Sequence, residues 1–178
     1  LEKDRANRLL SRGPRFRMDA EMVRDYALSA SGILVPKLGG PSVKPYQPDG
    51  VWEAVAMIGS NTRDYVRDKG ENLYRRGVYT HWQRTYLHPS LLAFDAPTRE
   101  ECTAERTISN SPQQALTLMN DPIFVEAARV FAERILGEGG ATVSERVNWA
   151  WREALSRAPL PEEASILSSL FEKHLAQF

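Results

Sequence analysis

A small set of charged and aromatic side chains could bind a ligand or take part in chemistry. Asp95 lies between Phe94 and Ala96, shortly before Pro97, and we expect it in a turn that is at least partly buried. A buried carboxylate must be paired or hydrogen-bonded, which predicts that Asp95 accepts from local backbone N–H groups and from an arginine. The expected arginine is Arg99 or the Arg75-Arg76 pair, in an architectural role, with a substrate or ion contact as the alternative. The complete set of binding candidates is Lys44, Tyr46, Arg75, Arg76, His81, Asp95, Arg99 and Arg106.

The residues that bind metal or haem are sparse. His81, His88 and His174 are far apart in sequence, and no second cysteine accompanies Cys102. Zinc sites usually need four closely spaced Cys, His or carboxylate ligands, and covalent haem attachment needs CxxCH. The sequence therefore predicts neither a metal site nor a haem in this chain. Cys102 is expected to be a buried thiol without a ligand.

Residues 61–93 interleave aromatic and basic side chains. This composition can serve single-stranded nucleic acid or a sugar, because a ring stacks while arginine pairs. The alternative is a set of half-buried rings with arginine stems packed over them. The chain carries 23 Lys and Arg against 23 Asp and Glu, and this balance argues against a general nucleic-acid binder. No run of about 18 apolar residues predicts a membrane span.

Three helix starts follow one another in the stretch 94–129. Thr98 with Glu101 fits a capping box, in which a hydroxyl and a carboxylate satisfy each other's free N–H groups. Ser111-Pro112 places proline at a first helical position, and Asp121-Pro122 supplies a carboxylate cap. The short helix from Pro112 is expected to stop at Asn120, forming a corner between its neighbours.

The rest of the chain predicts a mainly α fold without a significant sheet. We expect N-terminal helices within 1–34, a loop-rich middle over 35–97 and an antiparallel helical bundle over 98–178. Proline and glycine punctuate 36–48, while 51–58 and 74–85 are predicted as short helices. Apolar residues recur at helical spacing in three stripes after Asp121, with a capping box at Thr142-Glu145.

Several strings resemble a known family. They are Gly39-Gly-Pro-Ser-Val-Lys-Pro-Tyr-Gln-Pro48, Asn72-Leu-Tyr-Arg-Arg76, Phe94-Asp-Ala-Pro97 with Arg99 and Cys102, and Asn120-Asp-Pro122 with Phe124-Val-Glu-Ala-Ala-Arg129. They are similar to a planctomycete-specific domain of unknown function found in the C-terminal part of large cytochrome c-domain proteins. The chain departs from that family where Glu105 and Ile108 replace basic residues and where Leu160 replaces the threonine before Pro161.

The resemblance has implications for location and partners. It implies an exported protein, periplasmic or at the cell surface, with haem c possible elsewhere in the parent polypeptide. It also implies that another domain precedes this one, and we expect the 178 residues to be one helical domain that starts inside a larger unit. Helices made to be covered by the missing part should then expose an apolar patch larger than a few hundred Å².

Two functions remain open from the sequence. The first is a non-catalytic helical module that packs against the preceding domain and positions a redox partner or a polysaccharide. The second is part of an enzyme acting on a polysaccharide or sulfated sugar, with Arg76, His81 and Asp95 near one cleft. An enzyme needs a concave pocket where acid, base and cationic groups converge, whereas a module needs a broad apolar or mixed face.

Overall fold

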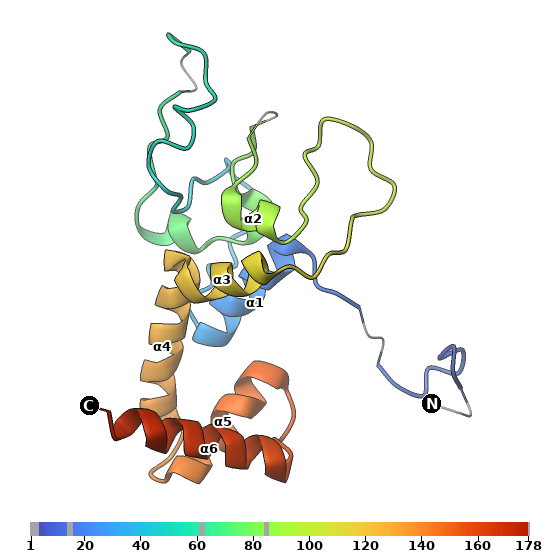
Figure 1. Ribbon diagram of the computed structural model, residues 1–178, viewed down its shortest axis with the longest axis vertical. Coiled ribbons are helices and arrows are strands. Elements are labelled where there is room, and N and C mark those ends of the chain that lie inside the picture. Colours follow the sequence, from blue (N-terminus) through green and yellow to red (C-terminus); the bar gives the residue numbers. More distant parts are fainter. Residues whose placement is uncertain (1–3, 14–15, 61–62, 84–85, 178) are drawn as a thin grey trace.

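The computed structural model describes residues 4–13, 16–60, 63–83 and 86–177. These residues form six α-helices and two 3₁₀ helices and contain no strand, which confirms the mainly α class (Figure 1). Three isolated β-bridges are the closest approach to a sheet among them. The elements are α1 (Ala20–Ser31), η1 (Gly70–Tyr74), η2 (Gly77–Tyr79), α2 (Pro89–Ala93), α3 (Pro112–Asn120), α4 (Pro122–Glu138), α5 (Val143–Leu155) and α6 (Pro161–Leu175).

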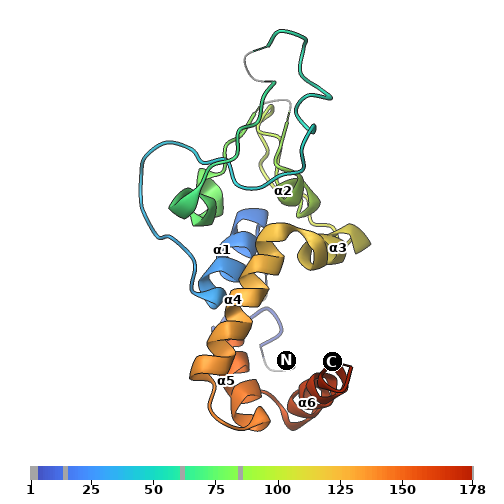
Figure 2. The ribbon, with the colours of Figure 1, turned by 90° about the vertical axis from the view of Figure 1, so that its left-hand side faces the viewer.

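The centre of the molecule is the packing of α1 against α4 (Figure 2). Leu28 of α1 meets Ile123 and Phe124 at the start of α4, and all three are buried. Helix α1 ends where the sequence predicts, because Gly32 adopts a left-handed φ of 82° and its N–H bonds back to the last turn. Burying such side chains contributes roughly 1.5–3 kcal/mol each.

A second cluster joins α1 to α2. Ala20, Leu87, Leu91 and Ala96 are buried together at the beginning of α1. Phe94 packs against both clusters, and its ring meets Phe124 edge-on with centroids 6.4 Å apart. The end of α2 is therefore fixed between the two halves of the core, which places the adjacent turn at Asp95.

The loop-rich middle is held by backbone bonds and buried polar groups instead of by helices. Val35 bridges to Arg75 and Val43 to Thr80, so the segment 35–43 runs beside 75–80. The predicted helix over 51–58 is wrong, since that segment consists of turns around the buried Trp52. The predicted helix over 74–85 is replaced by η2 up to Tyr79, with 84–85 outside the described residues. Gly50 and Gly59 limit the first segment to eight residues, of which only Trp52 is buried, and Gly77 interrupts the second. Helices this short are marginal unless they bury an apolar face.

Two expectations at the flanks of the helical half are also corrected. No helix starts at Thr98: residues 97–110 form a long loop, in which the Thr98 hydroxyl accepts from Glu100 N–H at 3.4 Å. The described residues before Asp19, 4–13 and 16–18, contain turns and no helix. A capping box shows only that a helix can begin at that position. A stable helix also needs an apolar face to bury, and residues 98–110 have none.

The last three helices pack in sequence, α4 against α5 and α5 against α6. Their starts agree with the sequence, since Asp121 accepts from Ile123 N–H and Thr142 and Glu145 complete a capping box. Neither α5 nor α6 contains a buried residue. These two helices are therefore attached to the core through α4 and leave much of their apolar surface open.

Candidate functional site

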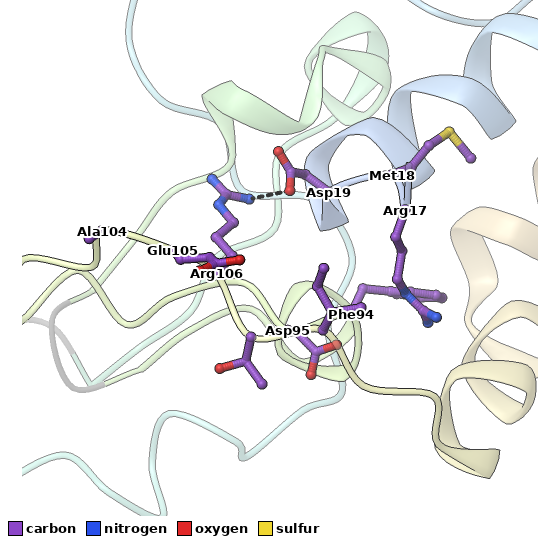
Figure 3. A pocket seen from close by; sticks show the side chains of 10 residues that line it. Arg17, Met18, Asp19, Phe94, Asp95, Ala104, Glu105 and Arg106 are labelled. Atoms are coloured by element: carbon purple, nitrogen blue, oxygen red, sulfur yellow. Dashed lines mark ion pairs between the residues drawn. The ribbon is translucent and has the colours of Figure 1, made fainter. Parts of the chain in front are cut away.

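A pocket of about 390 Å³ lies between the start of α1 and the loop that follows α2 (Figure 3). It brings together two of the sequence candidates, Asp95 and Arg106, with Arg17 and Asp19 facing them from the approach to α1. Its lining residues are Arg17, Met18, Asp19, Phe94, Asp95, Ala104, Glu105, Arg106, Thr107 and Ile108.

Asp95 anchors the loop across this pocket. It has a left-handed φ of 62°, a conformation that aspartate tolerates better than most residues. Its carboxylate accepts from the backbone N–H of Ser109 at 2.9 Å and from the Ser109 hydroxyl at 2.8 Å. Gln114 of α3 donates from Nε2 at 3.4 Å. The bonds from Ser109 lower the pKa of Asp95, so the group is ionised near neutral pH.

The expected arginine partner of Asp95 is therefore corrected. None of Arg75, Arg76 and Arg99 donates to it. Arg17 acts on Asp95 only through its charge, and its guanidinium donates to the side chain of Gln114. The carboxylate is satisfied by a serine 14 residues further along the chain, a partner that the local sequence does not reveal. The observed partners of Asp95 are thus Ser109 and Gln114, and they differ from the predicted arginine.

Glu21 in the first turn of α1 holds the other side of the loop. Arg106 donates to its carboxylate through two N–H groups, at 2.7 and 3.3 Å. Figure 3 shows the second ion pair of the same guanidinium, with Asp19 at 3.6 Å. Arg99 reaches Glu21 at 3.7 Å and stacks over Trp82, 3.8 Å from the ring centroid. Burial alone would raise the pKa of Glu21, but the hydrogen bond and charge of Arg106 outweigh burial and the pKa is lowered.

Three charged side chains that line the pocket thus have partners within the protein. Arg106 binds Glu21, Asp95 binds Ser109, and Arg17 binds Gln114. Arg106 connects loop 97–110 to the start of α1 through Glu21, and Ser109 connects the same loop to Asp95 and to Gln114 of α3. We call this set of contacts between loop 97–110 and the starts of α1 and α3 the clasp. A hydrogen bond to a charged group contributes about 1.5–3 kcal/mol when it is not fully exposed.

Comparison with known proteins identifies the family. Residues 1–171 match the family model described as PSD1, protein of unknown function (DUF1553). The chain belongs to this PSD1 family. No curated protein and no solved structure matches it.

The other binding candidates of this PSD1 chain do not line the pocket around Asp95. Arg75 is buried, stacks on Tyr79 at 3.9 Å and donates to the backbone oxygens of Lys37, Gly39 and Pro41. It therefore folds the Gly-Gly-Pro loop around itself. Arg76 pairs with Asp25 of α1 at 2.9 Å. Both arginines have structural partners on neighbouring segments.

Lys44, Tyr46 and His81 belong to the loop-rich middle. Lys44 lies 5.6 Å from the centroid of the Trp52 ring, and the His81 ring packs at a tilt on the same indole, 5.7 Å between centroids. Burial, followed by the charge of Lys44, lowers the pKa of His81. The Tyr46 carbonyl is 2.7 Å from Nε2 of the buried His88. Neither Arg76 nor His81 lines the pocket that holds Asp95, so the three proposed enzyme residues do not meet there.

Cys102 in loop 97–110 is exposed, which contradicts the expected burial. The expectation depended on a capped helix at Thr98, and without that helix no apolar surface covers the thiol. Across the described parts of the chain, no group of three or more His, Cys, Asp and Glu side chains is arranged to hold a metal ion. No helix among these residues is long and apolar enough to cross a membrane.

Three residues that complete the clasp were missed by sequence reasoning. Glu21 and Gln114 are buried, and Ser109 is half-buried. Glu21 carries a weak signal, an acid in the first turn of a helix, but that signal normally indicates a favourable helix dipole. Ser109 and Gln114 carry no such sequence signal, because their role depends on the path by which loop 97–110 comes back to Asp95.

A separate apolar groove of about 430 Å³ runs between α4, α5 and α6. Leu136 of α4 is 61% exposed at its edge, and Phe171 of α6 is 39% exposed on the opposite side. Arg146 contributes the charged side chain of the lining. The groove is lined by Ala132, Ile135, Leu136, Val143, Arg146, Val147, Ala150, Leu167 and Phe171.

Proposed function

We propose that this PSD1 chain is a non-catalytic helical interaction module that receives an amphipathic helix in the groove between α4, α5 and α6. The observation that carries the proposal is the lining, in which eight apolar residues and Arg146 face an open groove. An open apolar groove between helices is the type of surface that binds an amphipathic helix.

The proposed occupant is a helix from the preceding domain of the same polypeptide. Apolar side chains at every third or fourth position would fill the groove, and a carboxylate of the incoming helix would meet Arg146. In this proposal the parent is a large exported cytochrome c-domain protein, periplasmic or cell-surface. Haem c is carried elsewhere in it, and the module positions a redox partner or a polysaccharide. Family resemblance supports this parent and location.

The clasp around Asp95 supports the non-catalytic reading. Its charged groups are used to tie a loop to two helices, and the pairings leave no nucleophile with an adjacent base among the residues lining that pocket. An enzyme acting on polysaccharide or sulfated sugar would instead need cationic and acidic groups directed at a shared substrate position.

The test uses the full parent protein and the Leu136→Asp substitution. A carboxylate at this exposed groove edge should weaken docking of the preceding domain at least tenfold, because an ion would be buried against apolar side chains. Limited proteolysis of the linker and titration of the separately expressed preceding domain would measure the change.

The matched control is Leu92→Asp. Leu92 on α2 is 58% exposed and lies far from the groove lining, so the same substitution there should leave docking unchanged. Equal docking in wild type and Leu136→Asp would refute the proposal. Turnover of a polysaccharide or sulfated sugar by the chain, abolished by Asp95→Asn, would favour the enzyme.

A further inference from the structure

Helix α6 carries a second apolar strip outside the groove. Ile166 is 67% exposed and Leu170 is 46% exposed, whereas Leu167 and Phe171 on the neighbouring face line the groove. Ile166 and Leu170 are four residues apart, and therefore lie one above the other on the helix surface. Figures 1 and 2 show α6 at the end of the molecule remote from α2 and α3.

Charges of opposite sign flank this strip. Glu162 lies four residues before Ile166, and Lys173 lies three residues after Leu170, so the four side chains share one face. Both charged residues are exposed, and neither forms an ion pair with any residue in the described ranges. The neighbouring Glu163 is different, because it binds Arg157 at 2.8 Å and caps the helix. We name Glu162, Ile166, Leu170 and Lys173 the outer strip.

The order acid, apolar, apolar, base makes the outer strip complementary to itself. A two-fold axis between Ile166 and Leu170 would set each Ile166 against Leu170 of a second copy in antiparallel orientation. Glu162 of each copy would then come within about one helical residue, roughly 1.5 Å along the axis, of the position opposite Lys173. A parallel arrangement would instead place like charges together. Two-fold interfaces use the same patch on both subunits, as this pattern requires.

We propose that the outer strip of α6 is a homodimer interface in which two copies of the chain pack antiparallel through Ile166 and Leu170. The apolar pair supplies the contact, and the two Glu162–Lys173 pairs select the orientation. A single helix pair is a small interface, so the dimer is weak and concentration-dependent. Its flanking ion pairs are exposed, so they contribute more to specificity than to affinity and are screened by salt.

Charge reversal gives a direct test by sedimentation equilibrium over a concentration series at low salt. Wild type should dimerise reversibly, whereas Glu162→Lys and Lys173→Glu should each associate at least tenfold more weakly. Mixing the two variants should restore association, because both pairs in the mixed dimer are again of opposite sign. The double variant Glu162→Lys/Lys173→Glu should behave like wild type.

Two controls separate this interface from other effects. Glu172→Lys makes the same charge change on an exposed position of α6 outside the strip and should leave dimerisation unaltered. Leu136→Asp, which blocks the groove, should also leave it unaltered, so failure of the groove proposal would be distinguishable. A monomer at every concentration up to the millimolar range would overturn the proposal. So would a wild-type dimer that persists in the single reversals, or a mixture that fails to associate.

Discussion

At the scale of single residues, a few polar side chains form the hydrogen bonds and ion pairs that connect distant segments. Asp95 fixes the return of a long loop through Ser109, and Glu21 fixes the same loop through Arg106. His88 performs a similar task in the middle of the chain, where Nε2 donates to the Tyr46 carbonyl and Nδ1 accepts from Ser90 at 2.9 Å. These contacts give the loops defined paths without a sheet.

Removing the Asp95 carboxylate should destabilise the fold moderately. Asp95→Ala loses the bonds from Ser109 and also places alanine at a left-handed φ, so the expected loss is about 2–3 kcal/mol. Asp95→Asn keeps an acceptor and tolerates that φ, and should lose only about 1 kcal/mol. Chemical denaturation measures both. Identical unfolding midpoints for Asp95→Ala and wild type would show that the clasp is not stabilising.

Acid should destabilise the fold through His88. Burial lowers the pKa of His88 from 6.5 to about 4, so the folded state keeps the ring neutral while the unfolded chain binds a proton below about 6.5. The free energy of unfolding should therefore fall by about 3 kcal/mol as the pH drops from 6.5 to 4, on top of the carboxylate contributions. In His88→Gln this extra loss should disappear. A variant with the same pH profile as wild type would assign the loss to other groups.

At the scale of elements, the loop-rich middle is positioned by a close backbone contact between η2 and α1. Gly77 begins η2 directly against α1, and its N–H donates to the carboxylate of Asp25. A Cβ at this position would lie 2.9 Å from the backbone Cα and carbonyl oxygen of Glu21. Only glycine permits this contact, and the preceding Arg76 pairs with Asp25 of the same helix.

Two glycine substitutions should therefore have opposite signs. Gly77→Ala should destabilise by about 1–3 kcal/mol, because α1 must move to admit the methyl group. Gly137→Ala in the last turns of α4 meets no atom within 4 Å and should stabilise by up to about 1 kcal/mol through helix propensity. Thermal unfolding compares them. A neutral Gly77→Ala would mean that η2 can separate from α1 without loss.

At the scale of the whole molecule, the two core clusters and the last two helices occupy different parts of the chain. Both core clusters are formed by residues 20–124, and α5 and α6 bury none of their residues. Contacts across the junction include the Phe131–Trp149 ring pair, 6.0 Å apart, and Arg134 with Glu153 at 3.2 Å. The fold thus consists of a core whose buried residues contact one another and a helical extension, α5 and α6, whose apolar side chains stay partly exposed.

Removal of residues 139–178 should leave the core folded. The expected product retains a cooperative unfolding transition with a lower denaturant dependence, because less surface becomes exposed on unfolding. Its denaturation midpoint should stay close to that of the full chain. A truncated chain that is unfolded in buffer, by circular dichroism and proteolysis, would show that α5 and α6 are part of the cooperative core.

The sequence by itself determined the features that depend on neighbouring residues. Capping residues, glycine and the period of apolar side chains predict the starts at Pro112, Pro122 and Val143, the end at Gly32 and the mainly α class of the described residues. The sequence also singled out Asp95 and Arg106 as candidate binding residues, and both line the same pocket.

Tertiary structure alone decided the contacts between residues far apart in the chain. Cys102 is exposed because no face was available to bury a helix at Thr98, and Asp95 binds Ser109 because loop 97–110 returns to α3. Burial of Glu21 likewise depends on two arginines from that loop. Local sequence signals determine where a helix can begin. The contacts that stabilise a loop come from residues far away in the chain, and no sequence pattern marks those partners.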